Sequence, residues 1–133
     1  MRFNRITIVY EDKPKRYDLN ELLQWYALSL GLFSIRDKDK SRFRIFIILI
    51  KSLKNNKVLT SDEIAEKLGL TRGTVIHHLN QMMNSGIVTN QRNKYFLNVK
   101  NLEELTDTIK GNIIAVFQEL KEIAKEIDDR LEL

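Results

Sequence analysis

Residues 60–86 contain two sets of helix start and stop signals, and only a two-residue turn separates them. Thr60 and Glu63 have the spacing of a capping box, in which a hydroxyl and a carboxylate satisfy free amides at a helix start. Thr71 can cap the second helix, and Gly86 offers the left-handed position that commonly ends one. The sequence therefore predicts two short helices joined by a tight turn, at residues 61–68 and 72–85.

The flanking segments extend this helix pair into a longer pattern. Residues 42–54 are so apolar that they predict a buried helix, and residues 58–59 predict a short extended piece. After the helix pair, residues 87–90 and 94–99 read as two strands joined by the polar tip 91–93. This order is that of a winged helix-turn-helix, in which the second helix of the pair enters the DNA major groove.

The same stretch also carries a family resemblance, in the residues LTSDEIAEKLGLTRGTVIHHLNQMMNSGIV followed by NKYFLN. Its most specific parts are EIAEKLGL, the Thr-x-x-Thr-Val-x-x-His-Leu stretch at 71–79, and Ser-Gly-Ile-Val at 85–88. Over roughly residues 42–99 it resembles the arsenic-repressor (ArsR) type of winged helix, found in bacterial and archaeal regulators. The resemblance implies sequence-specific DNA binding as a homodimer.

The residues before this domain predict a separate N-terminal unit. Residues 3–10 are rich in strand-forming side chains, and residues 16–19 can return as the second strand of a β-hairpin. Asn20 can cap a following helix, which stops near Gly31. We therefore expect a mainly α (α+β) protein in three parts: the N-terminal hairpin and helix (1–36), the winged helix-turn-helix domain (37–100) and a long C-terminal helix (101–133).

The C-terminal helix, from about residue 102 to 131, has an apolar stripe with alternating spacings of three and four residues. That spacing is typical of a coiled-coil seam, so the stripe either folds back on its own domain or pairs with a second copy. We favour pairing, because two domains related by a two-fold axis could read two DNA half-sites. The predicted dimerisation residues are Ile109, Ile113, Val116, Leu120, Ile123 and Ile127.

A helical projection of residues 71–85 predicts which side chains meet DNA. Val75, His78, Leu79 and Met82 share the side that packs on the preceding helix, so the polar side chains point away from it. Amide and imidazole groups suit hydrogen bonds to base edges, and cations suit phosphates; the alternative is an ordinary solvated surface. With the hairpin tip included, the predicted DNA-binding residues are Thr71, Arg72, Gly73, Thr74, His77, Asn80, Gln81, Asn84, Arg92, Asn93 and Lys94.

The charges divide unevenly along the chain. Residues 1–60 carry 13 Lys and Arg against 6 Asp and Glu, whereas residues 101–133 carry 4 against 9. A basic body beside an acidic tail suits a protein of which one part meets a polyanion. An unevenly charged solvated surface is the alternative. Double-stranded DNA and a second copy of the chain are the expected partners.

Other classes of function find little support in the sequence. The absence of Cys excludes thiolate metal sites, and the neighbouring His77 and His78 diverge by about 100° on a helix, so we expect no metal site. No phosphate-binding glycine loop or nucleophile–base pattern is present, so we expect no catalytic residue, no cofactor and no enzyme activity. The alternative function is a winged-helix protein–protein interaction module within a transcription or nucleic-acid-processing complex.

The sequence also bears on where the chain acts. Its longest apolar run, at residues 45–50, is far shorter than the roughly 20 residues that a membrane-spanning helix needs. The first ten residues alternate polar and apolar side chains and contain no signal-peptide core. We therefore expect no membrane association and a cytoplasmic location.

Overall fold

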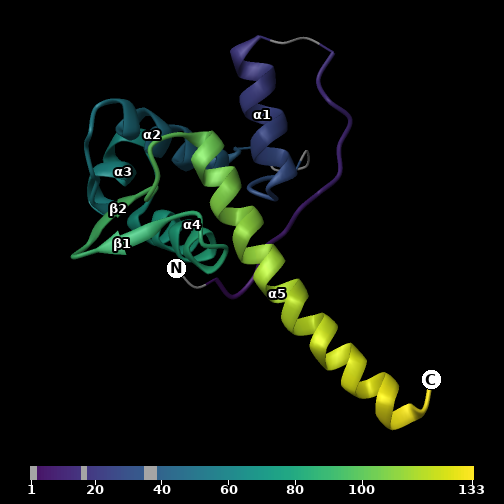
Figure 1. Cartoon of the computed structure of the whole chain (residues 1–133). Coiled ribbons are helices and arrows are strands. Elements are labelled where there is room, and N and C mark those ends of the chain that lie inside the picture. The colour runs from purple at the N-terminus through teal and green to yellow at the C-terminus, as the bar shows by residue number, and fades with distance from the viewer. Residues whose placement is uncertain (1–2, 16–17, 35–38) are drawn as a thin grey trace.

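The computed structural model describes residues 3–15, 18–34 and 39–133. Within these ranges the elements are α1 (Leu19–Ser29), α2 (Ser41–Lys54), α3 (Ser61–Leu68), α4 (Arg72–Asn84), β1 (Thr89–Gln91), β2 (Lys94–Phe96) and α5 (Leu102–Leu131). In Figure 1, α2, α3, α4 and the hairpin form one body, and α5 starts on this body and runs out far beyond it. The mainly helical architecture and its small hairpin confirm the predicted winged helix-turn-helix fold.

The helix pair has the caps that the sequence predicts. The Glu63 N–H donates to Thr60 Oγ1 at 3.1 Å, and the Thr60 N–H donates to Glu63 Oε1, also at 3.1 Å. Thr71 Oγ1 accepts from the Thr74 N–H at 3.2 Å at the start of α4. Gly69 ends α3 with a φ of 66°, in the left-handed region that favours glycine. These local bonds fix the start of α4 relative to α3.

The wing is a two-stranded antiparallel hairpin. Its strands are shorter than the predicted ranges 87–90 and 94–99, and its turn has two residues instead of the predicted three at 91–93. Both turn residues, Arg92 and Asn93, have positive φ values, 54° and 62°. Two left-handed residues define the turn type that best matches strand twist in two-residue hairpins.

The core lies between α2 and the elements that follow it. Phe46 and Leu49 of α2 are fully buried, as is Leu79 of α4. The hairpin is tied to this core through Leu59, which forms an antiparallel bridge with Tyr95. The Tyr95 N–H donates to the Leu59 carbonyl at 2.7 Å. Within the predicted extended piece at residues 58–59, Leu59 therefore pairs with β2 as a very short third strand would.

The predicted N-terminal hairpin is wrong. The described residues 3–15 contain no strand, and Leu19 already belongs to α1. Residues 16–17, which fall within the predicted second strand, lie outside the described residues. Residues 3–10 have strand-forming side chains, but in the described part of this segment they pair with no second strand.

The amides of the N-terminal segment bind helix ends instead of a strand. The amides of Asn4 and Arg5 both donate to the carbonyl of Asn84, the last residue of α4, at 2.7 and 3.1 Å. The Val9 N–H donates to the carbonyl of Ser29, the last residue of α1, at 2.8 Å. Helix C-termini have carbonyls without partners inside the helix, and these carbonyls take the place of a second strand.

The first helix begins earlier than the sequence indicates. Its cap is Asp18, whose Oδ1 accepts from the Glu21 N–H at 2.8 Å, and the predicted cap, Asn20, lies inside the helix. α1 is joined to α5 by a hydrogen bond of 2.7 Å between the Tyr26 hydroxyl and Thr106 Oγ1. Burial raises the pKa of Tyr26 above its ordinary value, so the phenol stays protonated in this contact.

The two halves of α5 have different surroundings. Near its start, Leu105 and Ile109 are only 1% and 5% exposed, because they belong to the core. Farther along, Leu120 and Ile127 are 55% and 50% exposed. The helix bounds agree with the prediction, and the stripe does not fold back on its own domain. None of the described helices is long and apolar enough to cross a membrane.

Candidate nucleic-acid interface

α4 has two chemically different faces. Its inner face buries Val75, Leu79 and Met82 completely in the core. Its outer face is polar, contains no Asp or Glu, and exposes Gly73, His77, Asn80 and Asn84. Spacings of four, three and four residues keep these positions in one row along the helix. The outer face therefore offers hydrogen-bonding groups and no negative charge.

The residues predicted to bind DNA come from three parts of the structure: the turn before α4, the helix itself and the hairpin tip. Nine of the eleven are exposed, and Thr74 and Lys94 are partly buried. The Thr71 hydroxyl is already occupied, since it donates to Thr74 Oγ1 at 2.8 Å as well as capping α4. Thr71 and Thr74 therefore stabilise the start of α4, and the other exposed residues of this group provide the free hydrogen-bonding groups.

Two cations of this group have carboxylates nearby. Arg72 Nε lies 3.5 Å from Asp62 Oδ1, but both side chains are about two-thirds exposed, so water weakens the pair. The pKa of Glu63 lies below its ordinary value, chiefly because of the Thr60 N–H, then the Thr60 hydroxyl, with a smaller contribution from Lys94. Such solvent-exposed partners can be exchanged for a phosphate at low energetic cost.

The adjacent histidines have different surroundings. His78 is partly buried and its Nδ1 accepts a hydrogen bond from Arg42 Nε at 3.1 Å, which links α4 to α2. His77 is exposed on the outer face, with its ring centroid 5.4 Å from that of His78. In the described part of the chain, no group of three or more His, Cys, Asp or Glu is arranged to hold a metal ion.

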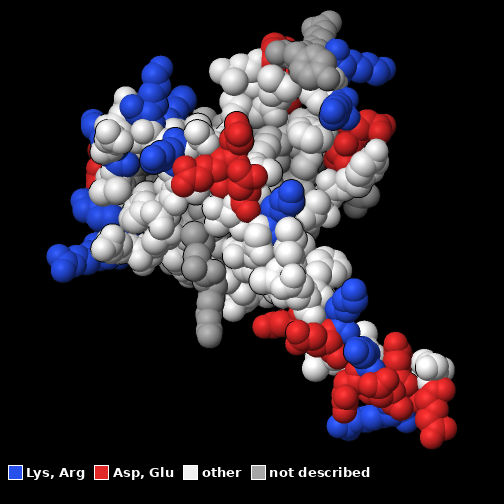
Figure 2. Space-filling model, in the orientation of Figure 1, with Lys and Arg blue, Asp and Glu red and all other residues white. Residues whose placement is uncertain are grey.

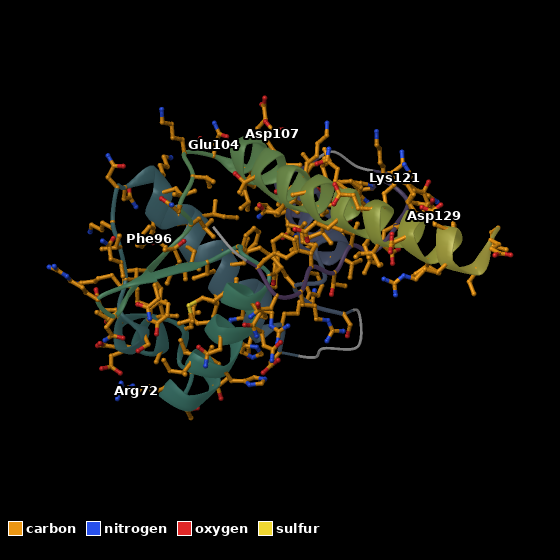
Figure 3. The ribbon with its side chains drawn as sticks, turned by 60° about the horizontal axis from the view of Figure 1, so that its bottom comes forward. Arg72, Phe96, Glu104, Asp107, Lys121 and Asp129 are labelled. Atoms are coloured by element: carbon orange, nitrogen blue, oxygen red, sulfur yellow. The ribbon has the colours of Figure 1, made fainter. Side chains whose placement is uncertain are left out.

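The charges are unevenly distributed over the surface. Figure 2 shows Lys and Arg on the side that carries α3 and the hairpin, Asp and Glu at the start of α5, and both signs together toward the C-terminal end of α5. In Figure 3, Arg72 at the start of α4 lies across the molecule from Glu104 and Asp107 at the start of α5. The outer face of α4 is thus kept apart from the acidic side chains of α5.

A second candidate surface is the distal stripe of α5, which we define as Ile113, Val116, Leu120, Ile123 and Ile127. All but the partly buried Ile113 are at least 39% exposed. Ile109, also predicted as a dimerisation residue, is buried in the core and cannot contact a second copy. Sequence reasoning missed three other exposed apolar residues of α5, although the three-residue spacing of the first two was a usable signal: Ile114, Phe117 and Leu131.

The comparison with protein families agrees with this geometry. Residues 47–90 match the family model described as "Bacterial regulatory protein, arsR family". The matched range begins within α2, includes the whole helix pair and ends in β1. No curated protein and no solved structure matches the chain significantly. With the capped helix pair and the wing, this match identifies residues 47–90 as an ArsR-like winged helix-turn-helix domain, and the chain that carries it is a DNA-binding transcriptional regulator.

Proposed function

We propose that the protein is a homodimer that binds specific sites in double-stranded DNA through α4 and its wing, and that it regulates transcription by occupying them. The observation that carries this proposal is the polar outer face of α4, which has no carboxylates and lies opposite the face that is buried in the apolar core. A helix of this kind fits the major groove, where base edges present distinct donors and acceptors. A cytoplasmic location follows from the proposal, because the protein must reach the chromosome.

His77 and Asn80 are the proposed base-reading residues. Both are exposed near the middle of the outer face, where a helix in the groove comes closest to base edges. An Asn side chain can donate to and accept from the same adenine, and an imidazole can donate to a base acceptor. Gly73 has no side chain, so the backbone can approach the DNA closely there. Gln81 and Asn84 extend the same polar face.

Arg72, Arg92 and Lys94 are the proposed phosphate-binding residues, with Asn93 beside them at the hairpin tip. Arg72 stands at the first position of α4, where unpaired helix amides also favour an anion. Arg92 lies at the exposed end of the wing, which the bridge to Leu59 holds against the body. Contacts of this kind fix the position of the protein on DNA and carry no sequence information themselves.

We further propose that the distal stripe of α5 joins two copies. The distal stripe from Ile113 to Ile127 spans roughly 21 Å of helix, long enough for several layers of side chains from a second helix. Exposed Leu120, Ile123 and Ile127 would lose their contact with water in such a pair. The chain then divides into an N-terminal segment with α1 (1–36), a DNA-binding domain (37–100) and a dimerisation helix (101–133).

Selection of bound fragments from random and genomic DNA tests the proposal directly. We expect one enriched, two-fold symmetric sequence, with half-site centres separated by about one helical turn or a multiple of it. The affinity for that sequence must exceed that for unrelated DNA at the same salt concentration. A wild-type protein that enriches no sequence, or binds no DNA at low salt, would contradict the proposal.

A further inference from the structure

A polar cavity of about 440 Å³ borders the C-terminal end of α4. Its polar lining includes Arg5 of the N-terminal segment, Arg42 of α2, and Gln81 and Asn84 of α4. Gln81 and Asn84 belong to the face that we propose contacts DNA. Among the described residues that line the cavity, none is acidic. The cavity therefore suits an anion, and it lies beside the proposed DNA-binding face.

The N-terminal segment is held firmly at this cavity. The amides of Asn4 and Arg5 share the Asn84 carbonyl as their acceptor, which fixes both residues to the last turn of α4. At Gly31, where φ is 67°, a Cβ would lie only 2.9 Å from the side chain of Thr7. The segment thus packs directly on the turn after α1, and its hydrogen bonds to Asn84 place the backbone of Arg5 at the end of α4.

The two guanidinium groups at the cavity differ in their surroundings. Arg42 donates from Nε to His78 Nδ1, so its side chain is held against α4. The Arg5 side chain is exposed and makes no hydrogen bond or ion pair with the described part of the chain. Guanidinium groups bind phosphate oxygens through charge-assisted, often bidentate hydrogen bonds. Arg5 therefore has both the position and the free donors for such a ligand.

We propose that Arg5, at this cavity, binds a backbone phosphate of DNA at the C-terminal end of α4. The 13 residues of α4 span about 20 Å, whereas the major groove is about 12 Å wide. A helix of that length in the groove lies near a sugar–phosphate backbone at each end. Arg72 serves the N-terminal end and Arg5 the C-terminal end. The inference rests on the proposed DNA-binding function and adds the N-terminal segment to the interface.

The test compares Arg5→Ala with Lys13→Ala. Lys13 is an exposed cation of the same segment that does not line the cavity, so its substitution removes an equal charge. Dissociation constants are measured between 50 and 200 mM salt, on the selected site and on unrelated DNA. We expect Arg5→Ala to reduce the slope of log affinity against log salt by about 0.9, which over this range is a three- to fourfold effect. Lys13→Ala leaves the slope near that of the wild type.

Two further measurements, on Arg5→Lys and with inorganic phosphate, complete the test. Arg5→Lys should recover much of the slope, because it restores the positive charge. If wild type binds DNA but Arg5→Ala has an unchanged slope, the inference is wrong and the proposed function stands. If wild type binds no DNA, the proposed function itself fails. If titration with inorganic phosphate detects an Arg5-dependent site while the DNA slope ignores Arg5, the cavity is a small-anion site and the assignment to DNA is overturned.

Discussion

Apolar residues are buried in the body formed by α2, α3, α4 and the hairpin, whereas they are exposed on the distal half of α5. In the body, side chains such as Phe46, Leu49 and Leu79 are fully enclosed. On α5, Leu120 and Ile123 remain 55% and 61% exposed. Contiguous exposed apolar surface commonly marks an interaction site. The difference indicates that the body buries its apolar side chains within one copy of the chain. The apolar side chains on the distal half of α5 would be buried only by a partner.

The exposed surfaces of these two regions also differ in their chemistry. The outer face of α4 offers amides, an imidazole and nearby cations, which suit a polar, negatively charged partner. The distal stripe offers branched apolar side chains with acidic residues beside them, which suit another helix and not DNA. Substitutions in the two regions should therefore separate folding, assembly and DNA binding into distinct measurements.

The largest effect on folding is expected in the core. Replacing fully buried Leu79 by Ala leaves a cavity and should lower the free energy of unfolding by about 2–5 kcal/mol. The matched control is Asn80→Ala, because the next residue of the same helix is exposed and should change stability by less than about 0.5 kcal/mol. Urea unfolding followed by circular dichroism measures both. Equal losses for the two variants would mean that the faces of α4 are wrongly assigned.

Assembly should respond to charge in the distal stripe. Leu120→Lys combined with Ile123→Lys puts like charges into a helix pair and should separate the subunits, since buried unpaired charges are costly. Affinity for the selected site should then fall about a hundredfold or more, because the second half-site loses its effective concentration. Sedimentation and light scattering report the oligomeric state. Lys substitutions at exposed Gln118 and Glu122, on the polar side of α5, provide the matched control. A monomeric wild type at high concentration would contradict the pairing.

Local signals explain how much of the fold could be predicted. The capping box at Thr60 and Glu63 and the cap at Thr71 act within a few residues, so the sequence defines them almost completely. The bounds of α5 were predictable from its periodicity. The outer face of α4 follows from the positions of Val75 and Leu79, because one helix has a fixed period.

Tertiary contacts explain what could not be predicted. Residues 3–10 have strand-forming side chains, but their amides bind the carbonyls of Asn84 and Ser29, which lie far away in the sequence. Ile109 continues the spacing of the distal stripe, yet the core buries it. No local pattern distinguishes it from Ile123. The presence of Arg5 at the end of α4 has the same origin, since only the folded chain brings the two together.

Base reading should respond to the outer face of α4. Replacing His77 and Asn80 with Ala should lower affinity for the selected site by about 1–3 kcal/mol per lost base contact. Affinity for unrelated DNA should change little, because phosphate contacts remain. Competition binding with both DNAs separates the two effects. The face assignment fails if footprints and specific affinity are unchanged in folded variants.

Phosphate contacts should have a different signature. Replacing Arg72, Arg92 or Lys94 with Ala should weaken binding to all sequences alike, and each lost contact should reduce the salt slope by about 0.9. Lys51→Ala, an exposed cation on α2, is a control for the loss of general charge. The salt dependence is measured with one DNA of fixed length. An altered site preference with an unchanged slope would instead assign these residues to base contacts.

The smallest expected effect is the pH dependence of the capping box. The Thr60 N–H and then its hydroxyl hold the pKa of Glu63 below its ordinary value of 4.5, so the folded state favours the ionised carboxylate. The resulting stability is present above pH 4.5 and is lost as the pH falls through the lowered, folded-state pKa. Glu63→Gln removes this titration, so its stability deficit relative to wild type should shrink between pH 6 and pH 3. Urea unfolding across that range measures Glu63→Gln and the wild type. A Glu63→Gln deficit that stays constant with pH would show that the carboxylate's charge has no part in starting α3.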